Sequence, residues 1–255
     1  MKAVILAAGA ASRLRPYTDE LPKTLLPVGG VPLLRRTMTN LMRVGFDQFV
    51  ICTGYLEHLI QAAVTSWFPD LDITFVSNAE YRTTNNSTSL LLARPHVEGH
   101  AFMLLDDDVV FDVDVLEGLV DRGPDCLAVR SVGELGLEEV KVTADNQDRV
   151  LAIGKHVPVR SAMGESVGIA LFSAATSRRL FAALHHRVRE LGLVDEYYEA
   201  AFQQLVDEGT TLYGMDIGSM YASEIDTVED LTAANVRVAQ HPAFDVSVDS
   251  VPLAV

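Results

Sequence analysis

The chain opens on a short apolar run that ends in a loop of small residues. Lys2–Ala8 is continuously apolar after its lysine, and Gly9-Ala10-Ala11-Ser12 follows it directly. Such a run predicts a strand buried on both faces, as in a parallel sheet. A loop without bulky side chains lets a phosphate chain approach backbone N–H groups. Because Arg13 and the loop lysine Lys23 add positive charge, this region predicts a nucleoside-triphosphate site.

Two segments of this region resemble the signature of the nucleotidyltransferases that make NDP-sugars and CDP-alcohols. They are Leu6-Ala7-Ala8-Gly9-x-x-x-Arg13-Leu14-x-Pro16 and Pro22-Lys23-x-Leu25-Leu26-Pro27. The resemblance implies a catalytic Arg13 that holds the β- and γ-phosphates and the leaving pyrophosphate. It implies a catalytic Lys23, an exposed loop residue, that bridges the α-phosphate and the incoming phosphate. The residues that it implies for nucleotide binding are Leu6, Ala7, Ala8, Gly9, Ala10 and Ser12.

Composition excludes several other classes of protein. The net charge is −15, whereas a duplex-binding protein carries a basic face, so no nucleic-acid partner is expected. The N-terminus lacks a signal-peptide pattern and no long apolar stretch occurs, so we expect a cytoplasmic protein without a membrane partner. Cys52 and Cys126 lie in apolar runs and are expected to be buried free thiols. Homo-oligomer formation is compatible with all of these features.

Strand and helix patterns alternate in the first half, which predicts an α/β fold with a mostly parallel central sheet and helices on both faces. The expected strands are Lys2–Ala8, Gln48–Thr53, Asp72–Ser77 and Ala101–Leu105, and the expected helices are Pro32–Val44, Tyr55–Trp67 and Ser87–Arg94, the last ended by Pro95. Shorter strands then predict a small β-rich acceptor-binding region: Cys126–Ser131, Glu139–Ala144, Arg149–Lys155 and Ser166–Phe172. Three helices and two strands complete a single nucleotidyltransferase domain expected over 1–240. The helices are Ala174–Leu191, Asp195–Asp207 and Thr227–Ala239, and the strands are Thr211–Met215 and Tyr221–Ile225. Residues 241–255 are expected to be a C-terminal tail.

Acidic residues follow two of the expected strands. Asp106-Asp107-Asp108 ends the fourth strand, and three adjacent carboxylates repel one another unless a cation is present. The resemblance places Asp107 at the family's Mg²⁺ position, and strand alternation predicts that it points away from its two neighbours. It also implies that Asp226 is the second metal ligand. The alternative is that Asp226 or Thr227 caps the following helix, with Thr227 and Asp230 as a capping box.

A third segment bears on the substrates. Asn85-Asn86-Ser87-Thr88-Ser89-Leu90 resembles the phosphocholine cytidylyltransferase branch, which implies CTP as the nucleotide and Asn85, Asn86 and Ser89 as its ligands. The alternative is that Asn86 or Ser87 only caps a helix. The residues proposed for the second substrate, a phosphorylated small molecule, are Lys155, Glu165, Gly168, Asp195 and Tyr198. The resemblance implies that Lys155 contacts the acceptor phosphate, and the alternative is an exposed lysine at the end of a strand.

These patterns favour a Mg²⁺-dependent cytidylyltransferase that condenses CTP with a small phosphoalcohol or phosphonate to a CDP or CMP conjugate and pyrophosphate. One alternative is a sugar-1-phosphate nucleotidyltransferase that makes an NDP-sugar. Another is a non-catalytic nucleotide-sensing subunit. The last is disfavoured because Arg13, Lys23, Asp107 and Asp226 are all present.

Overall fold

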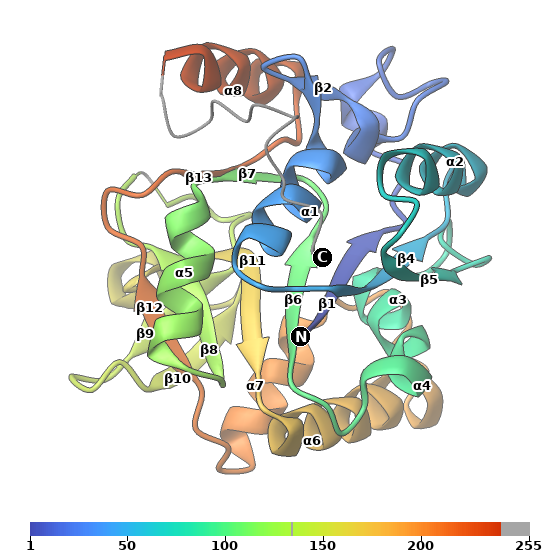
Figure 1. The fold of residues 1–255 in the computed structure, drawn as a ribbon. Coiled ribbons are helices and arrows are strands. Elements are labelled where there is room, and N and C mark those ends of the chain that lie inside the picture. The colour runs from blue at the N-terminus through green and yellow to red at the C-terminus, as the bar shows by residue number, and fades with distance from the viewer. Residues whose placement is uncertain (134, 241–255) are drawn as a thin grey trace.

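The computed structural model describes residues 1–133 and 135–240, so the expected tail at 241–255 lies outside the described residues (Figure 1). Its centre is a nine-stranded sheet with the strand order β10-β9-β11-β6-β1-β4-β5, in which β8 pairs with β11 and β12. The parallel half consists of β1 (Lys2–Ala7), β4 (Gln48–Thr53), β5 (Asp72–Ser77) and β6 (Phe102–Asp106). The predicted α/β architecture is confirmed.

Antiparallel strands extend this sheet beyond β6. The long strand β11 (Gly164–Phe172) pairs antiparallel with β6, β8 and β9 and is buried along its whole length. The remaining strands are β8 (Cys126–Arg130), β9 (Lys141–Ala144), β10 (Val150–Gly154) and β12 (Tyr213–Asp216). This half forms the β-rich region expected after the parallel strands.

Helices cover both faces of the sheet because the side chains of each strand alternate between them. In β1, Ala3, Ile5 and Ala7 pack toward one layer of helices, and Val4 and Leu6 pack toward the other. The first layer contains α1 (Leu33–Arg43), α2 (Glu57–Trp67) and α5 (Val113–Arg122). The second contains α3 (Asn86–Leu92), α4 (Arg94–Val97), α6 (Ala174–His185) and α7 (Glu199–Asp207).

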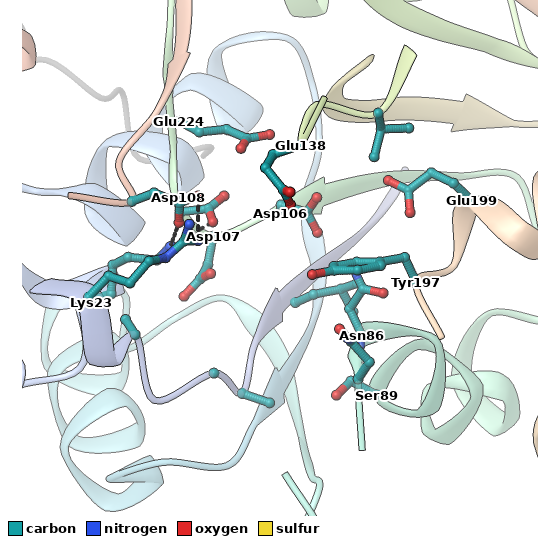
Figure 2. Close-up of a pocket in the computed structure, with 18 of the residues that line it drawn as sticks. Lys23, Asn86, Ser89, Asp106, Asp107, Asp108, Glu138, Tyr197, Glu199 and Glu224 are labelled. Carbon is teal, nitrogen blue, oxygen red and sulfur yellow. Dashed lines mark hydrogen bonds and ion pairs between the residues drawn. The ribbon is translucent and has the colours of Figure 1, made fainter. Parts of the chain in front are cut away.

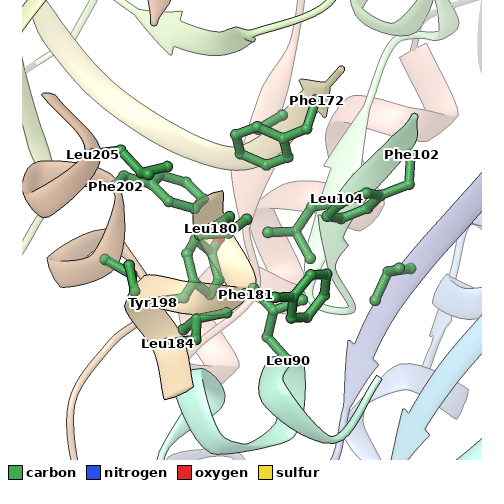
Figure 3. Packing of buried hydrophobic residues seen from close by; sticks show 14 of the residues in the cluster. Leu90, Phe102, Leu104, Phe172, Leu180, Phe181, Leu184, Tyr198, Phe202 and Leu205 are labelled. Atoms are coloured by element: carbon green, nitrogen blue, oxygen red, sulfur yellow. The ribbon is translucent and has the colours of Figure 1, made fainter. Parts of the chain in front are cut away.

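The second layer has an aromatic core that holds α6 and α7 on the sheet (Figure 3). Phe172 packs edge-on against Phe202, with ring centroids 5.1 Å apart, and Tyr198 lies 5.0 Å from Phe202. Aromatic pairs at these separations add to the stabilisation that burial provides. The Tyr198 hydroxyl also donates to Asp106, which holds the start of α7 at the carboxyl end of β6.

A smaller hydrophobic cluster above the sheet joins the segment after β1 to the C-terminal end of the described region. The hairpin β2 (Pro27–Val28) and β3 (Val31–Pro32), the ribbon β7 (Val109–Phe111) and β13 (Ala222–Glu224), and α8 (Val228–Gln240) surround it. The middle of the predicted late strand Tyr221–Ile225 is a strand, β13, but it pairs with β7 outside the central sheet. The sequence analysis did not predict β7 or α5.

Several helix boundaries differ from the predicted ones, most of them by one or two residues, and three of the differences are informative. Pro95 does not end a helix but lies in the first turn of α4, where its missing N–H costs no hydrogen bond. The helix predicted over Ala174–Leu191 is α6 followed by a π-helical turn at His186–Glu190. The helix predicted from Asp195 begins only at Glu199. In the described ranges, no helix combines the length and the apolar character needed to cross a membrane.

Candidate active site

A cavity of about 770 Å³ opens at the carboxyl ends of β1 and β6 (Figure 2). Ligands bind at this edge in open α/β sheets. Of the residues that the structure describes, ten carboxylate side chains but only four cationic ones line the cavity. The cationic residues are Arg13, Lys23, Arg130 and Lys155, and the acidic residues are Asp106, Asp107, Asp108, Glu138, Glu139, Glu165, Glu199, Glu224, Asp226 and Asp230.

The small-residue loop after β1 forms one wall. Leu6, Ala8 and Gly9 line the cavity, and a side chain built at Gly9 would meet nothing within 4 Å. The loop then turns through Ala11, which has a φ of 44°, into a short 3-10 helix at Ser12–Leu14. Among the other residues predicted to bind nucleotide here, Ala7, Ala10 and Ser12 do not line the cavity. The open backbone at Gly9 leaves room for a ligand against the end of β1.

Lys23 lies at the centre of the charged end of the cavity. Its Nζ donates to Asp108 Oδ2 at 2.7 Å and to Asp226 Oδ1 at 3.0 Å. Burial lowers the pKa of Lys23, but Asp108, Asp107 and Asp226 together raise it far more, so the side chain stays protonated. Its side chain is 11% exposed, which corrects the expectation of an exposed loop lysine.

The three adjacent aspartates do not alternate as predicted. All three line the cavity, because β6 ends at Asp106 and the chain turns at Asp107 and Asp108. Asp106 Oδ2 accepts a hydrogen bond from the Tyr198 hydroxyl at 2.7 Å, while Asp108 pairs with Lys23. Burial and the neighbouring Asp108 raise the pKa of Asp107 to about 7, against an opposing effect of Lys23.

The Asp226 side chain points into the site, and the following helix is capped by Thr227 and Asp230 instead. Thr227 and Asp230 form the predicted capping box: Asp230 Oδ2 accepts from the Thr227 N–H at 2.8 Å, and Thr227 Oγ1 accepts from the Asp230 N–H at 3.2 Å. Asp226 Oδ2 instead pairs with Arg13 at 2.7 Å and Oδ1 with Lys23. The residue reaches the cavity from the β7–β13 ribbon, and not from the central sheet as predicted.

These carboxylates suit a magnesium ion that a nucleotide would bring with it. Among the described residues, no group of three or more His, Cys, Asp or Glu side chains is arranged to hold a metal by itself. Mg²⁺ in phosphate-transfer sites takes one or two carboxylates, with phosphates and water as the other ligands. Asp107 and Asp226 line the cavity, and the buried Asp108 Oδ1 has no hydrogen-bond partner among the described residues. The donor set therefore fits a shared ion of this kind.

The segment before α3 combines a capping role with a place in the site. Asn85 is the N-cap of α3, and its Oδ1 accepts from the Asn86 N–H at 2.8 Å. The cap is thus one residue earlier than the alternative considered above. Asn86 Oδ1 accepts from the Tyr198 N–H at 2.9 Å, and Ser89 Oγ accepts from Asn78 Nδ2 at 3.0 Å. Asn85, Asn86 and Ser89 all line the cavity, as the nucleotide prediction requires.

The far side of the cavity comes from the antiparallel half of the sheet. Lys155 Nζ pairs with Glu138 at 3.4 Å and lies 4.7 Å from the centre of the Tyr197 ring. Glu165 is paired with Arg130, a residue that no sequence pattern indicated. Both Lys155 and Glu165 line the cavity.

Gly168 does not line the cavity but stands directly behind Asp106. It has a φ of +68°, and a Cβ there would lie 2.6 Å from Asp106 Oδ2. The glycine interrupts the pairing of β11 with β8 between Ser166 and Ala170. It thereby leaves space for the Asp106 carboxylate.

Two predicted acceptor residues lie away from this cavity. Tyr198 is 2% exposed and packs in the aromatic core, and Asp195 lines a second, adjoining cavity of about 600 Å³. Their neighbours Tyr197 and Glu199 line both cavities. Helical periodicity could have indicated this, because Tyr198 begins an apolar stripe with Ala201, Phe202 and Leu205, which turns Tyr198 toward the core.

A family model for the MobA-like NTP transferase domain matches residues 3–197. The chain belongs to this family. This NTP transferase is therefore a nucleotidyltransferase, and the family resemblance stated in the sequence analysis is confirmed.

Individual relatives are similar along most of the chain. It is 31% identical over 246 residues to CMP-5'-(3-aminopropyl)phosphonate synthase of Streptomyces rubellomurinus, a match that covers 93% of this chain and 38% of that protein. It is 27% identical over 233 residues to 2-aminoethylphosphonate cytidylyltransferase of Lancefieldella rimae, covering 91% and 90%. The chain thus spans well under half of the first relative and nearly all of the second.

Solved structures share the fold. The CTP:phosphocholine cytidylyltransferase from Streptococcus pneumoniae superimposes with a TM-score of 0.77 at 22% identity, covering 93% of this chain and 98% of that chain. The inositol-1-phosphate CTP transferase from T. maritima gives a TM-score of 0.75 at 23% identity, covering 90% of each chain.

Proposed function

We propose that residues 1–240 form a single domain that transfers a cytidylyl group from CTP to a small phosphonate or phosphoalcohol. The carrying observation is the convergence of Arg13, Lys23, Asp107 and Asp226 at the Gly9 loop. The cytidylyltransferase relatives and the Asn85–Ser89 segment support CTP as the donor.

The reaction is an in-line attack by an acceptor oxygen on the α-phosphorus of the nucleotide. The new P–O bond forms as the bond between the α-phosphorus and the bridging oxygen breaks, and pyrophosphate leaves. Both reactants are anions, and two unit charges ~4 Å apart repel by ~4 kcal/mol at an effective dielectric of ~20. Positioning and charge neutralisation therefore dominate catalysis, and no protein nucleophile is needed.

The cationic side chains divide this task by position. Arg13 lies at the exposed mouth beside Asp226, where it can hold the β- and γ-phosphates and the departing pyrophosphate. Lys23 is buried between Asp108 and Asp226 and can contact the α-phosphate together with the acceptor. Lys155 and Arg130 approach from the other side and are placed for the acceptor phosphonate.

Asp107 and Asp226 would hold Mg²⁺, which supplies neutralisation of the phosphate charge when it is bound. Asp108 keeps the Lys23 ammonium aimed into the cavity. Asn85, Asn86 and Ser89 present amide and hydroxyl groups that can hydrogen-bond a pyrimidine edge.

The deciding experiment measures pyrophosphate release with Mg²⁺. CTP, UTP, dTTP, GTP and ATP are each combined with 2-aminoethylphosphonate, phosphocholine, inositol phosphate or glucose-1-phosphate. We expect release with CTP and a non-hexose acceptor, and release only with a hexose-1-phosphate would refute the assignment. Arg13→Gln should lose this activity, whereas Arg15→Gln removes an equal charge that is 61% exposed and paired with Asp19, and should keep it.

A further inference from the structure

Glu199 is a buried acidic residue on the cavity wall, and one of its carboxylate oxygens has no hydrogen-bond partner among the described residues. It is 6% exposed and belongs to the linings of both the main cavity and the adjoining one. Its Oε2 atom is buried and has no hydrogen-bond partner among the described residues. Leaving a buried carboxylate oxygen unsatisfied is costly, so a group that completes it is expected in the working enzyme.

A purely structural role does not account for this placement. Glu199 is the first residue of α7, and a carboxylate there gains from the helix dipole. That gain is available to an exposed side chain and requires neither burial nor a position on the cavity wall. Burial raises the pKa of Glu199 to about 7, against opposing effects that include Lys155, so its charge is only partly compensated.

Carboxylates line the cavity from the Lys23 end to Glu199, and Lys155 is a cation on the Glu199 side. Figure 2 shows Lys23 on one side and Glu199 on the opposite side, with Asp106 and Glu138 between these two residues. An acceptor whose phosphonate lies near the basic residues would therefore direct its other end toward carboxylates. A zwitterion that is anionic at one end and cationic at the other complements this arrangement.

The surroundings of Glu199 favour a primary over a quaternary ammonium. Quaternary ammonium groups are bound by aromatic faces. The aromatic ring that shares the wall with Glu199 is Tyr197, and the Lys155 ammonium already lies 4.7 Å from its centre. Tyr81, which also lines the cavity, lies beside the Gly54 and Ala8 backbone at the nucleotide loop. Carboxylate oxygens, by contrast, accept the three N–H bonds of a primary ammonium.

We propose that the acceptor is an aminoalkyl phosphonate or phosphate with a primary ammonium, and that Glu199 Oε2 accepts a hydrogen bond from it. The proposal rests on the proposed cytidylyltransferase function and specifies its acceptor. Glu199 is then a specificity-determining residue, and the chemistry at the α-phosphorus does not involve it.

The test compares 2-aminoethylphosphonate with ethylphosphonate, which lacks only the amine, in the wild type and in Glu199→Gln. Because the variant loses a hydrogen bond between charged groups, its kcat/KM for 2-aminoethylphosphonate should fall by about 10- to 100-fold. The kcat/KM for ethylphosphonate should stay unchanged, as should the KM for CTP. Glu208→Gln removes an exposed charge from the end of the same helix and serves as the matched control.

Two results would overturn the proposal. An equal loss for both phosphonates would show that Glu199 acts through Lys155 or the fold, and wild-type preference for phosphocholine would show a quaternary site. Absence of CTP turnover with every acceptor would instead refute the proposed function. Calorimetric binding of the same two phosphonates needs no turnover, and equal binding by wild type and Glu199→Gln would refute the amine contact in that case too.

Discussion

Replacing Glu199 by glutamine should stabilise the ligand-free protein above neutral pH and change its stability much less near pH 5. Burial raises the pKa of this carboxyl from 4.5 to about 7. Between these values the folded state holds a proton that the unfolded state releases, so rising pH lowers the free energy of unfolding. At about 1.4 kcal/mol for each tenfold change in proton affinity, the full cost is roughly 3 kcal/mol above pH 8. Glutamine resembles the protonated side chain and avoids this cost.

Urea unfolding at pH 5 and pH 8, without nucleotide or metal, measures the effect. The fluorescence of Trp67, the single tryptophan, reports the transition. The difference between variant and wild type should grow by roughly 2.5 kcal/mol from pH 5 to pH 8, because the other titrating groups are common to both proteins. Glu208→Gln should show no such growth, since its side chain is exposed. A difference that does not depend on pH would refute the reasoning.

Three further predictions concern the charged end of the cavity. Lys23→Gln should lower kcat by about 10²-fold or more in the pyrophosphate assay, and it should also lower the melting temperature, because Asp108 and Asp226 lose their shared ion pair. Asp107→Asn should raise the Mg²⁺ concentration for half-maximal activity more than Asp106→Asn does, since Asp106 is bonded to Tyr198; a larger effect at Asp106 would contradict the assignment. Gly168→Ala should destabilise in urea by about 1–3 kcal/mol more than Gly209→Ala, because both have positive φ but a Cβ meets Asp106 only at Gly168.

Elements that depend on local sequence were the most predictable. The strands Gln48–Thr53 and Asp72–Ser77 have the predicted bounds, because each is a run ended by polar or small residues. The family signatures likewise placed Arg13, Lys23, Asp107 and Asp226 at one cavity. For Arg13 and Asp107, which follow β1 and β6, this convergence follows from the rule that the carboxyl ends of parallel strands share an edge.

Features that depend on non-local pairing were not predictable in this way. The ribbon that carries Asp226 joins β7 and β13, which are far apart in the chain, and nothing local distinguishes it from a central strand. Arg130 reaches the site only because β8 pairs with β11. The burial of Tyr198 is different, because the local apolar stripe of Tyr198, Ala201 and Phe202 could have predicted it.

The excess of carboxylates explains why a site for polyanions is built from mostly acidic side chains. With ten carboxylates and four cations among the described residues of its wall, the free cavity would repel a nucleotide and a phosphonate. Several of these acids resist ionisation in the free protein, since burial raises the pKa of Glu224 to about 8 and that of Glu199 to about 7. Cations that arrive with the substrates, Mg²⁺ with the nucleotide and an ammonium with the acceptor, would allow those acids to ionise and would offset the cost of burying them. An acceptor without an ammonium would leave Glu199 uncompensated, so the same residue that destabilises the free protein would select the substrate.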